Sequence, residues 1–465
     1  MRLGEGILVI INGLLLMQMV ISRTFLSQRV KHMLSATGAA VTVYHLIYEG
    51  YRWQMLPVYV LIGAVMLPQS RRLENHKRWL TTSGTWGLII LGVGILLLVL
   101  LPVPKLPPPT GPYAIGTVTY AWTDPARVEI YGNSPGGPRK LMVQIWYPAE
   151  KTGARVRQQW LESTKTARAM AQRDHLPAFL IEQVKLTRTH TYQGAEFIKD
   201  ASPYPVLIYI HGWAGFRNIN QDQIEALVSS GYVVISADHA YGALITLFPD
   251  GTIADNDPQA LNGDGTAPGK DEASNRLVRT FADDVRFIVD QAEKLNHADP
   301  DNRFAGRLDM SRIGVFGHST GGGAAVQFCA SDFRCKAFLG MDAWVEPVDE
   351  GIVQEGVSQP IMFLNSASWG QGPNRDQLRN LYTASPGPGY WIDIANTKHY
   401  DFVMVPTFSP IAPLLGFSGS LPAHTIMQIN HTYLIAFFDR YLMEHNIPWL
   451  DSPPVDFPAV DITSK

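Results

Sequence analysis

The sequence predicts an α/β protein in which helices cover both faces of a mostly parallel sheet, preceded by an α-helical transmembrane bundle. Two observations support this prediction. From about residue 113 onward, short β-branched and aromatic runs alternate with amphipathic helical stretches, which is the pattern of strands buried between two layers of helices. Before residue 105 the chain is apolar and poor in charge, as expected for helices that lie in a bilayer.

The membrane region is predicted from four uncharged stretches: Gly6–Ser22, Met33–Tyr48, Trp53–Ser70 and Trp79–Pro104. About 20 apolar residues span the hydrocarbon core. The fourth stretch meets this length and the first and third approach it. The second is short and contains His45, so a buried or re-entrant helix is the alternative there. A cleavable signal peptide over residues 1–25 is a further alternative, although Arg2 alone forms its basic region and no small-residue cleavage site follows.

Charge divides the chain at the same boundary. Residues 1–104 carry a net charge of +6 and the remaining 361 residues a net charge of −9. The loops after the first and third stretches are basic, and the positive-inside rule therefore places the segment after Pro104 outside the cytoplasm. A proline-dense segment follows and favours an extended spacer. We predict a membrane domain at 1–104, a linker at 105–112 and a catalytic domain at 113–465.

The domain after the linker is predicted to contain seven strands and four helices. The strands are 141–148, 205–212, 232–239, 312–319, 336–342, 360–366 and 389–394. The helices are 222–230, 275–296, 320–329 and 426–443. Ligands of such sheets bind at the carboxyl ends of the strands, so polar residues at those ends are the candidates for a functional site.

A nucleophile is predicted at Ser319. The strand that ends near Phe316 runs into Gly317-His318-Ser319-Thr320-Gly321 and then into helix-forming residues. This G-x-S-x-G motif, in its strand–turn–helix context, is a nucleophile elbow, where a strained turn holds the serine hydroxyl clear of the backbone. The alternative is a glycine-rich junction whose serine only caps the helix.

A serine nucleophile needs a base and a carboxylate that orients the base. His399 lies in a polar loop just past the strand 389–394 and is the predicted base, with a structural loop histidine as the alternative. Asp342 ends the strand 336–342 and is the predicted acid.

The strand after Asp342 ends in Asn365 and Ser366, so the usual alternative position for the acid carries no carboxylate. Asp376, ten residues further along, is the alternative acid.

The oxyanion of an acyl-transfer reaction needs two N–H donors. We predict the main-chain N–H of Thr320, which follows the nucleophile, and that of Trp213, which follows the strand 205–212 in an His-Gly turn. His211 in that turn is expected to make a structural hydrogen bond rather than to act as a second base.

These residues resemble the plasma and isoform II platelet-activating factor acetylhydrolases, which have the α/β-hydrolase fold. The similarity lies in "YPVLIYIHGWAGFR", "SSGYVVISADHAYG", "IGVFGHSTGGGAA", "FLGMDAW", "PIMFLNS" and "KHYDF". It implies Ser319, Asp342 and His399 as the triad and the Trp213 and Thr320 backbones as the oxyanion donors. It also implies a calcium-independent serine esterase for short or oxidised acyl groups of phospholipids, with no cofactor or metal. The polytopic N-terminal region and Trp213 depart from the secreted members.

Two further pairs of residues are candidates near the site. Trp344 and Trp369 each follow a strand end, and they line an apolar acyl pocket or serve as packing. Cys329 and Cys335 are the two cysteines of the chain; they exclude a disulfide-dense scaffold and a four-thiolate zinc site. A single disulfide between them is permissible if the domain lies outside the cytoplasm.

The sequence thus predicts a membrane-anchored serine ester hydrolase. Its expected partners are an ester substrate, such as a phospholipid, and the bilayer; a net charge of −3 gives no reason to expect nucleic acid. The alternative enzyme is a general carboxylesterase or polyesterase, similar to cutinase or dienelactone hydrolase, acting on non-lipid esters. The alternative from another class is a catalytically silent binding module.

Overall fold

A computed structural model describes residues 1–21, 26–66, 77–133, 135–150, 156–199, 202–451 and 457–465. The chain forms two compact units. The first comprises Met1–Lys105, Gln159–Thr187 and Thr407–Ile411, and the second comprises Leu106–Gln158, Arg188–Pro406 and Ala412–Lys465. The first boundary lies at the predicted linker. Two segments from beyond residue 113 thus group with the N-terminal helices.

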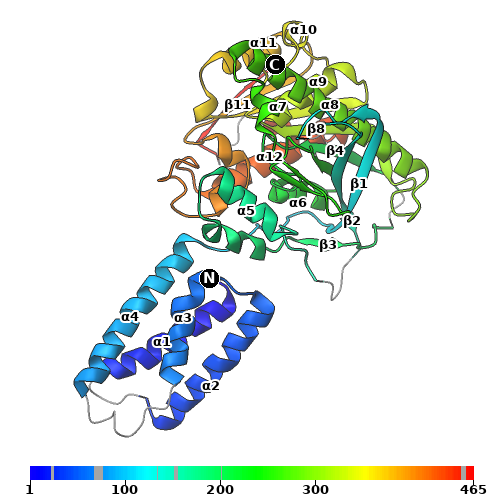
Figure 1. Ribbon diagram of the computed structural model, residues 1–465. Helices are drawn as coiled ribbons and strands as arrows, with labels where there is room; N and C mark the ends of the chain where they lie inside the picture. Colours follow the sequence, from blue (N-terminus) through cyan, green and yellow to red (C-terminus); the bar gives the residue numbers. More distant parts are fainter. Residues whose placement is uncertain (22–25, 67–76, 134, 151–155, 200–201, 452–456) are drawn as a thin grey trace. The chain divides into compact units, whose positions relative to one another are not determined.

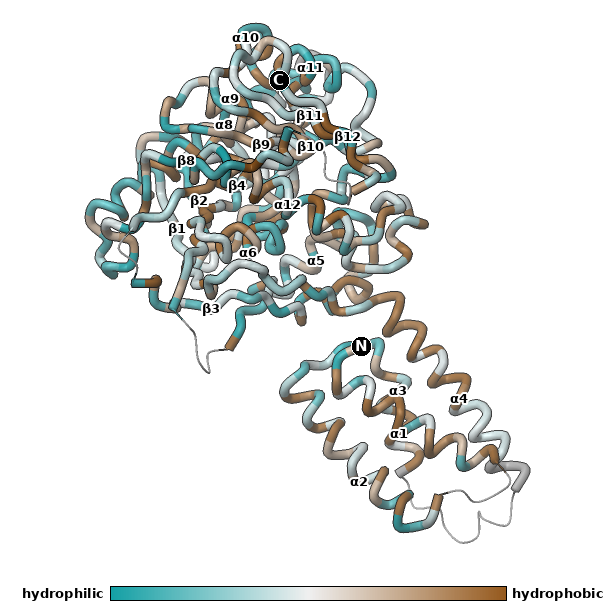
Figure 2. The backbone as a smooth tube through the Cα atoms, turned by 180° about the vertical axis from the view of Figure 1, so that it is seen from behind, coloured by the Kyte–Doolittle hydropathy of each residue, from teal (hydrophilic) through white to brown (hydrophobic). Residues whose placement is uncertain are grey.

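The first unit is a helical bundle, and each predicted stretch carries a helix. The helices are α1 (Leu3–Val20), α2 (Gln28–Tyr44), α3 (Leu56–Met66) and α4 (Lys77–Leu100). Among the described residues, two helical segments are long and apolar enough to cross a membrane, Leu3–Val20 and Thr81–Leu100, while Trp53–Val65 is apolar but shorter. Figure 2 shows the apolar character of α1 and α4 along their lengths.

Charged residues inside the bundle are paired. Glu5, which is fully buried, accepts hydrogen bonds from Nε (2.7 Å) and Nη2 (2.9 Å) of Arg52. Arg2 donates to the same carboxylate through Nε (2.8 Å). A buried carboxylate is costly unless it is paired and hydrogen-bonded, and this bidentate geometry meets that condition.

The segment Gln159–Thr187 contributes elements that the sequence patterns did not predict. They are α5 (Thr164–Arg173) and the 3-10 turns η3 (Ala178–Leu180) and η4 (Glu182–Leu186). The indole N–H of Trp53 donates to the Phe179 carbonyl (2.6 Å), and Gln54 Nε2 donates to Gln183 Oε1 (3.1 Å). These contacts tie the segment to the loop between α2 and α3.

The second unit is built on a ten-stranded sheet in the order β12-β11-β10-β9-β8-β4-β5-β2-β1-β3. Its strands are β1 (Ala114–Val128), β2 (Pro138–Ala149), β3 (Thr191–Gln193), β4 (Tyr204–Ile210), β5 (Val233–Asp238), β8 (Leu308–His318), β9 (Cys335–Met341), β10 (Ile361–Ser366), β11 (Gly389–Ile394) and β12 (Val460–Ser464). Neighbours from β11 through β5 are parallel, while β2 and β12 run antiparallel to their neighbours. The strands β6 (Ile245–Leu247) and β7 (Ile253–Asp255) form a separate hairpin. All seven predicted strands are present, and the mostly parallel α/β class is confirmed.

Helices cover both faces of this sheet. They are α6 (Gln221–Ser229), α7 (Pro258–Asn262), α8 (Ala267–His297), α9 (Thr320–Ser331), α10 (Glu350–Glu355), α11 (Pro373–Ala384) and α12 (Ala423–Leu442). Helix α8 packs on α9, and α12 packs on α6; Figure 1 shows the sheet between these two pairs. Helix α8 begins earlier than predicted because Thr266 caps it, its hydroxyl accepting from the N–H of Gly269.

The two cysteines are bonded to each other in the structure. Cys329 lies near the end of α9 and Cys335 begins β9, with their Cα atoms 5.2 Å apart. The disulfide therefore closes the short connection between the helix that follows Ser319 and the strand that precedes Asp342.

Candidate active site

Ser319 lies in the turn between β8 and α9 with a strained backbone, φ 55° and ψ −121°. The flanking glycines make this turn possible. A Cβ on Gly321 would collide with the carbonyl oxygen of Ile210 on β4, and a Cβ on Gly317 would collide with the carbonyl of Gly321. Helix α9 can therefore approach the sheet only with glycine at both positions. This arrangement is the strand–turn–helix elbow that the motif requires.

Asp342 and His399 come together at the carboxyl edge of the sheet. Asp342 directly follows β9, with φ 42°, and is completely buried. Its Oδ2 lies 3.0 Å from Nδ1 of His399. A carboxylate accepts, so Nδ1 carries the proton and Nε2 is left as the basic nitrogen. Asp376, the alternative acid, lies exposed on the first turn of α11.

His318 links the turn of Ser319 to the loop of His399. Its Nε2 donates to the main-chain carbonyl of His399 (3.0 Å), and the two imidazole rings lie 4.4 Å apart. Within the described residues, no hydrogen bond joins the Ser319 hydroxyl to the His399 ring. Catalytic hydrogen bonds are often long before substrate binds and tighten in the complex.

The two predicted oxyanion donors belong to segments close to Ser319. Thr320 is the first residue of α9, so its N–H has no partner within the helix and adds to the positive end of the helix dipole. Trp213 follows Gly212, and a Cβ on Gly212 would lie 3.1 Å from the Cβ of Ser319. The loop after β4 therefore approaches the nucleophile closely through backbone alone.

His211 supports that loop. Its Nδ1 donates to the carbonyl of Gly212 (2.7 Å), and its Nε2 accepts from the N–H of His239 (3.2 Å). Complete burial, reinforced by His239, lowers the pKa of His211 to about 3. The ring is therefore neutral near pH 7, and both of its nitrogens are engaged, in accordance with the predicted structural role.

A buried ionic network lies behind His211, and the sequence patterns gave no signal for it. His239 Nδ1 lies 2.9 Å from Oδ2 of Asp284, and Arg139 forms a bidentate pair with the same carboxylate, both distances being 2.7 Å. Burial opposes ionisation of Asp284, but the charge and hydrogen bonds of Arg139 prevail and hold its pKa well below the ordinary value. The network joins α8 to β2 and to the end of β5.

The two tryptophans predicted as pocket candidates both lie at the site. The indole of Trp369 stacks on the imidazole of His399, with centroids 4.3 Å apart and an interplanar angle of 15°. The main-chain N–H of Trp344 donates to the carbonyl of Ser319 (2.9 Å), and its indole donates to Glu346 (3.0 Å). Trp369 thus contacts the ring of His399, whereas Trp344 contacts the backbone of Ser319.

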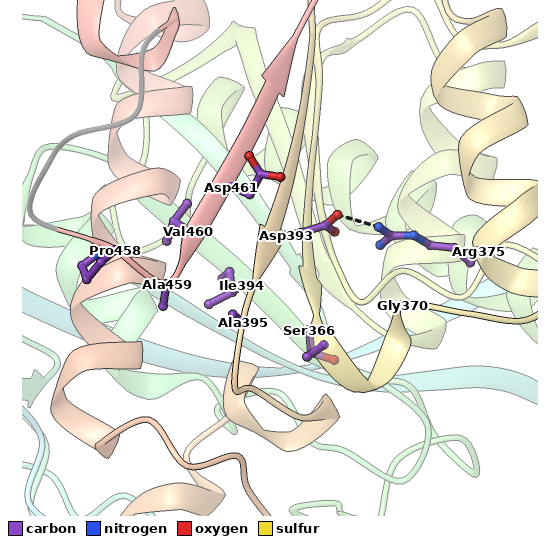
Figure 3. A pocket seen from close by; sticks show the side chains of 11 residues that line it. Ser366, Gly370, Arg375, Asp393, Ile394, Ala395, Pro458, Ala459, Val460 and Asp461 are labelled. Atoms are coloured by element: carbon purple, nitrogen blue, oxygen red, sulfur yellow. Dashed lines mark hydrogen bonds and ion pairs between the residues drawn. The ribbon is translucent and has the colours of Figure 1, made fainter.

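A pocket of about 320 Å³ lies at the ends of β10, β11 and β12. Figure 3 shows the residues that line it, among them Ser366 and the ion pair of Arg375 with Asp393 (2.6 Å). Ser319, Asp342 and His399 do not line this pocket, so it is not the acyl site. The described residues contain no cluster of three or more His, Cys, Asp or Glu that could hold a metal.

The fold and the elbow define a protein of the α/β-hydrolase class. The family model for platelet-activating factor acetylhydrolase, isoform II, matches residues 101–452, and the chain belongs to this family. A ferulic acid esterase from Streptomyces cinnamoneus has a similar structure, with a TM-score of 0.64 and 25% identity, covering 78% of this chain and 100% of the esterase.

Curated relatives agree with the family. The platelet-activating factor acetylhydrolase of Cavia porcellus is 24% identical over 53% of this chain and 59% of the relative. A probable 1-alkyl-2-acetylglycerophosphocholine esterase of Arthroderma benhamiae is 26% identical over 76% of this chain and 92% of the relative. The match to the vertebrate acetylhydrolases thus spans about 60% of their length.

Proposed function

We propose that this protein is a membrane-anchored serine ester hydrolase that cleaves short acyl groups from phospholipid-like esters through an acyl-enzyme. The observation that carries the proposal is the contact between Asp342 and His399, beside a nucleophile elbow that holds Ser319. An acid, a base and a nucleophile from three strand ends form the constellation that acyl transfer needs.

In the proposed reaction, Ser319 Oγ attacks the ester carbonyl while Nε2 of His399 takes the hydroxyl proton. Asp342 stabilises the imidazolium that forms. The N–H groups of Trp213 and Thr320 donate to the oxyanion; losing one such donor costs about 2.7–4 kcal/mol of transition-state stabilisation. The intermediate collapses as His399 returns the proton to the leaving alcohol. Water, activated by the same histidine, then hydrolyses the acyl-enzyme.

Membership of the acetylhydrolase family and the name of the Arthroderma benhamiae relative support an acetylated glycerophospholipid as the substrate class. The full-length structural match to a ferulic acid esterase supports the second candidate, a carboxylesterase for non-lipid esters. The two candidates share one mechanism and differ in the alcohol that leaves.

The bundle supports membrane anchoring in two ways. Two of its helical segments have the length and hydropathy of membrane spans. Large apolar side chains also face outward from several helices, among them Ile10, Val60 and Trp86, each more than 60% exposed. Such surfaces are unfavourable in water and favourable in lipid. The basic loops and the disulfide support an extracytoplasmic catalytic domain.

The test of the chemistry compares the full chain in detergent micelles with two variants. Ser319→Ala is expected to abolish hydrolysis of p-nitrophenyl butyrate and covalent labelling by a fluorophosphonate. Ser385→Ala, which removes another buried and hydrogen-bonded serine hydroxyl away from the site, is the matched control and should retain both. Labelling of Ser319→Ala at the wild-type rate would refute the assignment.

Substrate class is tested with phosphatidylcholines that carry acetyl, butyroyl or palmitoyl at sn-2, compared with methyl ferulate and p-nitrophenyl butyrate. The proposal expects the highest kcat/KM for the acetyl or butyroyl lipid. Preference for methyl ferulate over every lipid would favour the second candidate.

Membrane anchoring is tested by extracting membranes that contain the expressed chain with alkaline carbonate. The proposal expects the protein to remain in the pellet and to dissolve only in detergent. Its orientation is tested with alkaline phosphatase fused after Lys465, which is expected to be active because that enzyme needs an oxidising compartment. Release by carbonate, or an inactive fusion, would contradict the respective part of the proposal.

A further inference from the structure

The turn at the end of β10, Ser366–Trp369, comprises the last residue of the strand and the 3-10 turn Ala367–Trp369, and it contacts both the predicted acid and the predicted base. We propose that this turn positions the triad, with Ser366 fixing the carboxylate of Asp342 while Ser368 and Trp369 fix His399. The inference rests on the proposed function, since it assigns supporting residues to that same site. None of the three supporting side chains is a catalytic residue; each acts through Asp342 or His399.

Ser366 engages both oxygens of the acid. Its main-chain N–H donates to Oδ1 of Asp342 and its hydroxyl donates to Oδ2, each at 2.7 Å. Both residues are buried, with 2% and 0% exposure. Together with His399, the carboxylate receives three hydrogen bonds. Rotation of the carboxylate about its Cβ–Cγ bond would break all three, so Ser366 sets the direction in which Oδ2 faces the imidazole.

The same turn holds the base. The N–H of His399 donates to Ser368 Oγ (3.1 Å), which anchors the backbone of the base. The indole of Trp369 lies nearly parallel to the imidazole at 4.3 Å. The indole N–H points to the carbonyl of Ala343 at 3.4 Å, so the ring that supports His399 is itself held by the residue after the acid.

The two contacts have opposite electrostatic effects on the imidazolium that forms during the reaction. The Ser366 hydroxyl draws negative charge from Asp342, so its removal leaves a more basic carboxylate that stabilises the imidazolium more strongly. The face of the Trp369 indole attracts the imidazolium directly, so its removal destabilises the charged ring. A residue that only filled space would shift the titration of the base in neither direction.

The experiment measures kcat and KM for p-nitrophenyl butyrate from pH 4.5 to 9 on the full chain in detergent, with thermal unfolding measured alongside. The variants are Ser366→Ala, Trp369→Leu and Trp369→Phe, and Ser385→Ala is the matched control. We expect Ser366→Ala to lower kcat about 10- to 100-fold, because the carboxylate loses a hydrogen bond that holds Oδ2 toward the imidazole and this loss outweighs the gain in basicity. The same variant is expected to move the acid limb of the profile to higher pH.

Trp369→Leu is expected to lower kcat about 3- to 10-fold and to move the acid limb to lower pH. Trp369→Phe, which keeps an aromatic face, is expected to have a kcat and an acid limb close to those of wild type. A role of Trp369 in binding the acyl chain would instead raise KM and leave kcat and the acid limb in place. That result would overturn the assignment of Trp369, and the Phe variant keeps the comparison valid if the Leu variant is unstable.

The assignment of Ser366 would be overturned if the folded Ser366→Ala variant kept kcat within twofold of wild type and its acid limb did not move. If that variant unfolds below the assay temperature, Ser366→Thr, which keeps the hydroxyl, must retain the wild-type profile. Ser319→Ala distinguishes failure of the proposed function from failure of the inference about the turn. If Ser319→Ala is active, the proposed function fails. If it is inactive while Ser366→Ala and Trp369→Leu behave like wild type, the inference about the turn alone fails.

Discussion

Replacing Asp342 by asparagine tests how the acid controls the base. The side chains are nearly equal in size, but the amide brings an NH₂ group into a position where the structure offers only donors. Oδ1 accepts from the main-chain N–H of Ser366, while Oδ2 accepts from the Ser366 hydroxyl and from Nδ1 of His399. The NH₂ group of the asparagine must therefore occupy either the Oδ1 or the Oδ2 position and face a donor there.

The backbone N–H of Ser366 cannot turn, whereas its hydroxyl can rotate and accept. The amide oxygen should consequently take the Oδ1 position and the NH₂ the Oδ2 position, facing His399. Nδ1 must then accept, and the ring proton moves to Nε2, the nitrogen that has to take the proton of Ser319. In this tautomer the imidazole has no lone pair on Nε2 with which to take that proton. The same substitution in a serine-protease triad lowers kcat about 10⁴-fold, equivalent to about 5 kcal/mol of barrier.

The assay is kcat for p-nitrophenyl butyrate at pH 7.5, with the rate of fluorophosphonate inactivation as a second measure of the nucleophile. Asp376→Asn is the matched control, because Asp376 is the other candidate acid and lies exposed on α11; its activity should stay within about twofold of wild type, as for surface changes away from a site. A loss of less than tenfold for Asp342→Asn, or a large loss for Asp376→Asn, would refute the reasoning.

Three further outcomes are expected. The pKa of His211, which burial lowers to about 3, lies below that of the unfolded chain, so the unfolded state binds the extra proton below about pH 6.5. As the pH is lowered from 6 to 4, the free energy of unfolding should therefore decrease more steeply in wild type than in His211→Asn. The two slopes should differ by about 1.4 kcal/mol per pH unit; parallel slopes in urea titrations would contradict this. Opening the disulfide with Cys329→Ser and Cys335→Ser should cost about 2 kcal/mol, since it closes a short loop, and equal melting temperatures with and without reductant would count against it. Gly321→Ala should prevent folding or labelling, because its Cβ meets the backbone of β4, and a stable, active variant would show that α9 can shift.

The central strands and the positions of Ser319, Asp342 and His399 at one edge of the sheet could be predicted because their signals are local. Continuous apolar runs mark the strands buried on both faces. Ser319 and Asp342 directly follow β8 and β9, and His399 lies in the loop after β11. The G-x-S-x-G spacing indicates a turn because helix α9 can approach β4 only where no Cβ intervenes. The contact between Asp342 and His399 then follows from parallel strands whose carboxyl ends share one edge.

Other features could not be predicted, for reasons that differ. Strand β1 lies beside the edge and mixes polar with apolar residues around Pro125, so it lacks the signal of a buried strand. The bidentate pair of Arg139 with Asp284 joins residues 145 positions apart, and no local pattern reports such a partner. The segment Gln159–Thr187 has short, weakly apolar elements, and only the structure shows that it groups with the bundle.

The position of Asp342 after β9 restricts which residue type can stand at the end of the neighbouring strand β10, where the chain has Ser366. Strands β9 and β10 are parallel and in register, with Met341 opposite Leu364, and the N–H of Asp342 donates to the Leu364 carbonyl (2.8 Å). Asp342, which follows β9, and Ser366, the last residue of β10, therefore lie side by side. Two carboxylates at 2.7 Å would repel each other and one would take up a proton, whereas a hydroxyl supplies the donor that a buried carboxylate needs. With Asp342 after β9, Ser366 is thus the physical complement of that carboxylate rather than an empty alternative position.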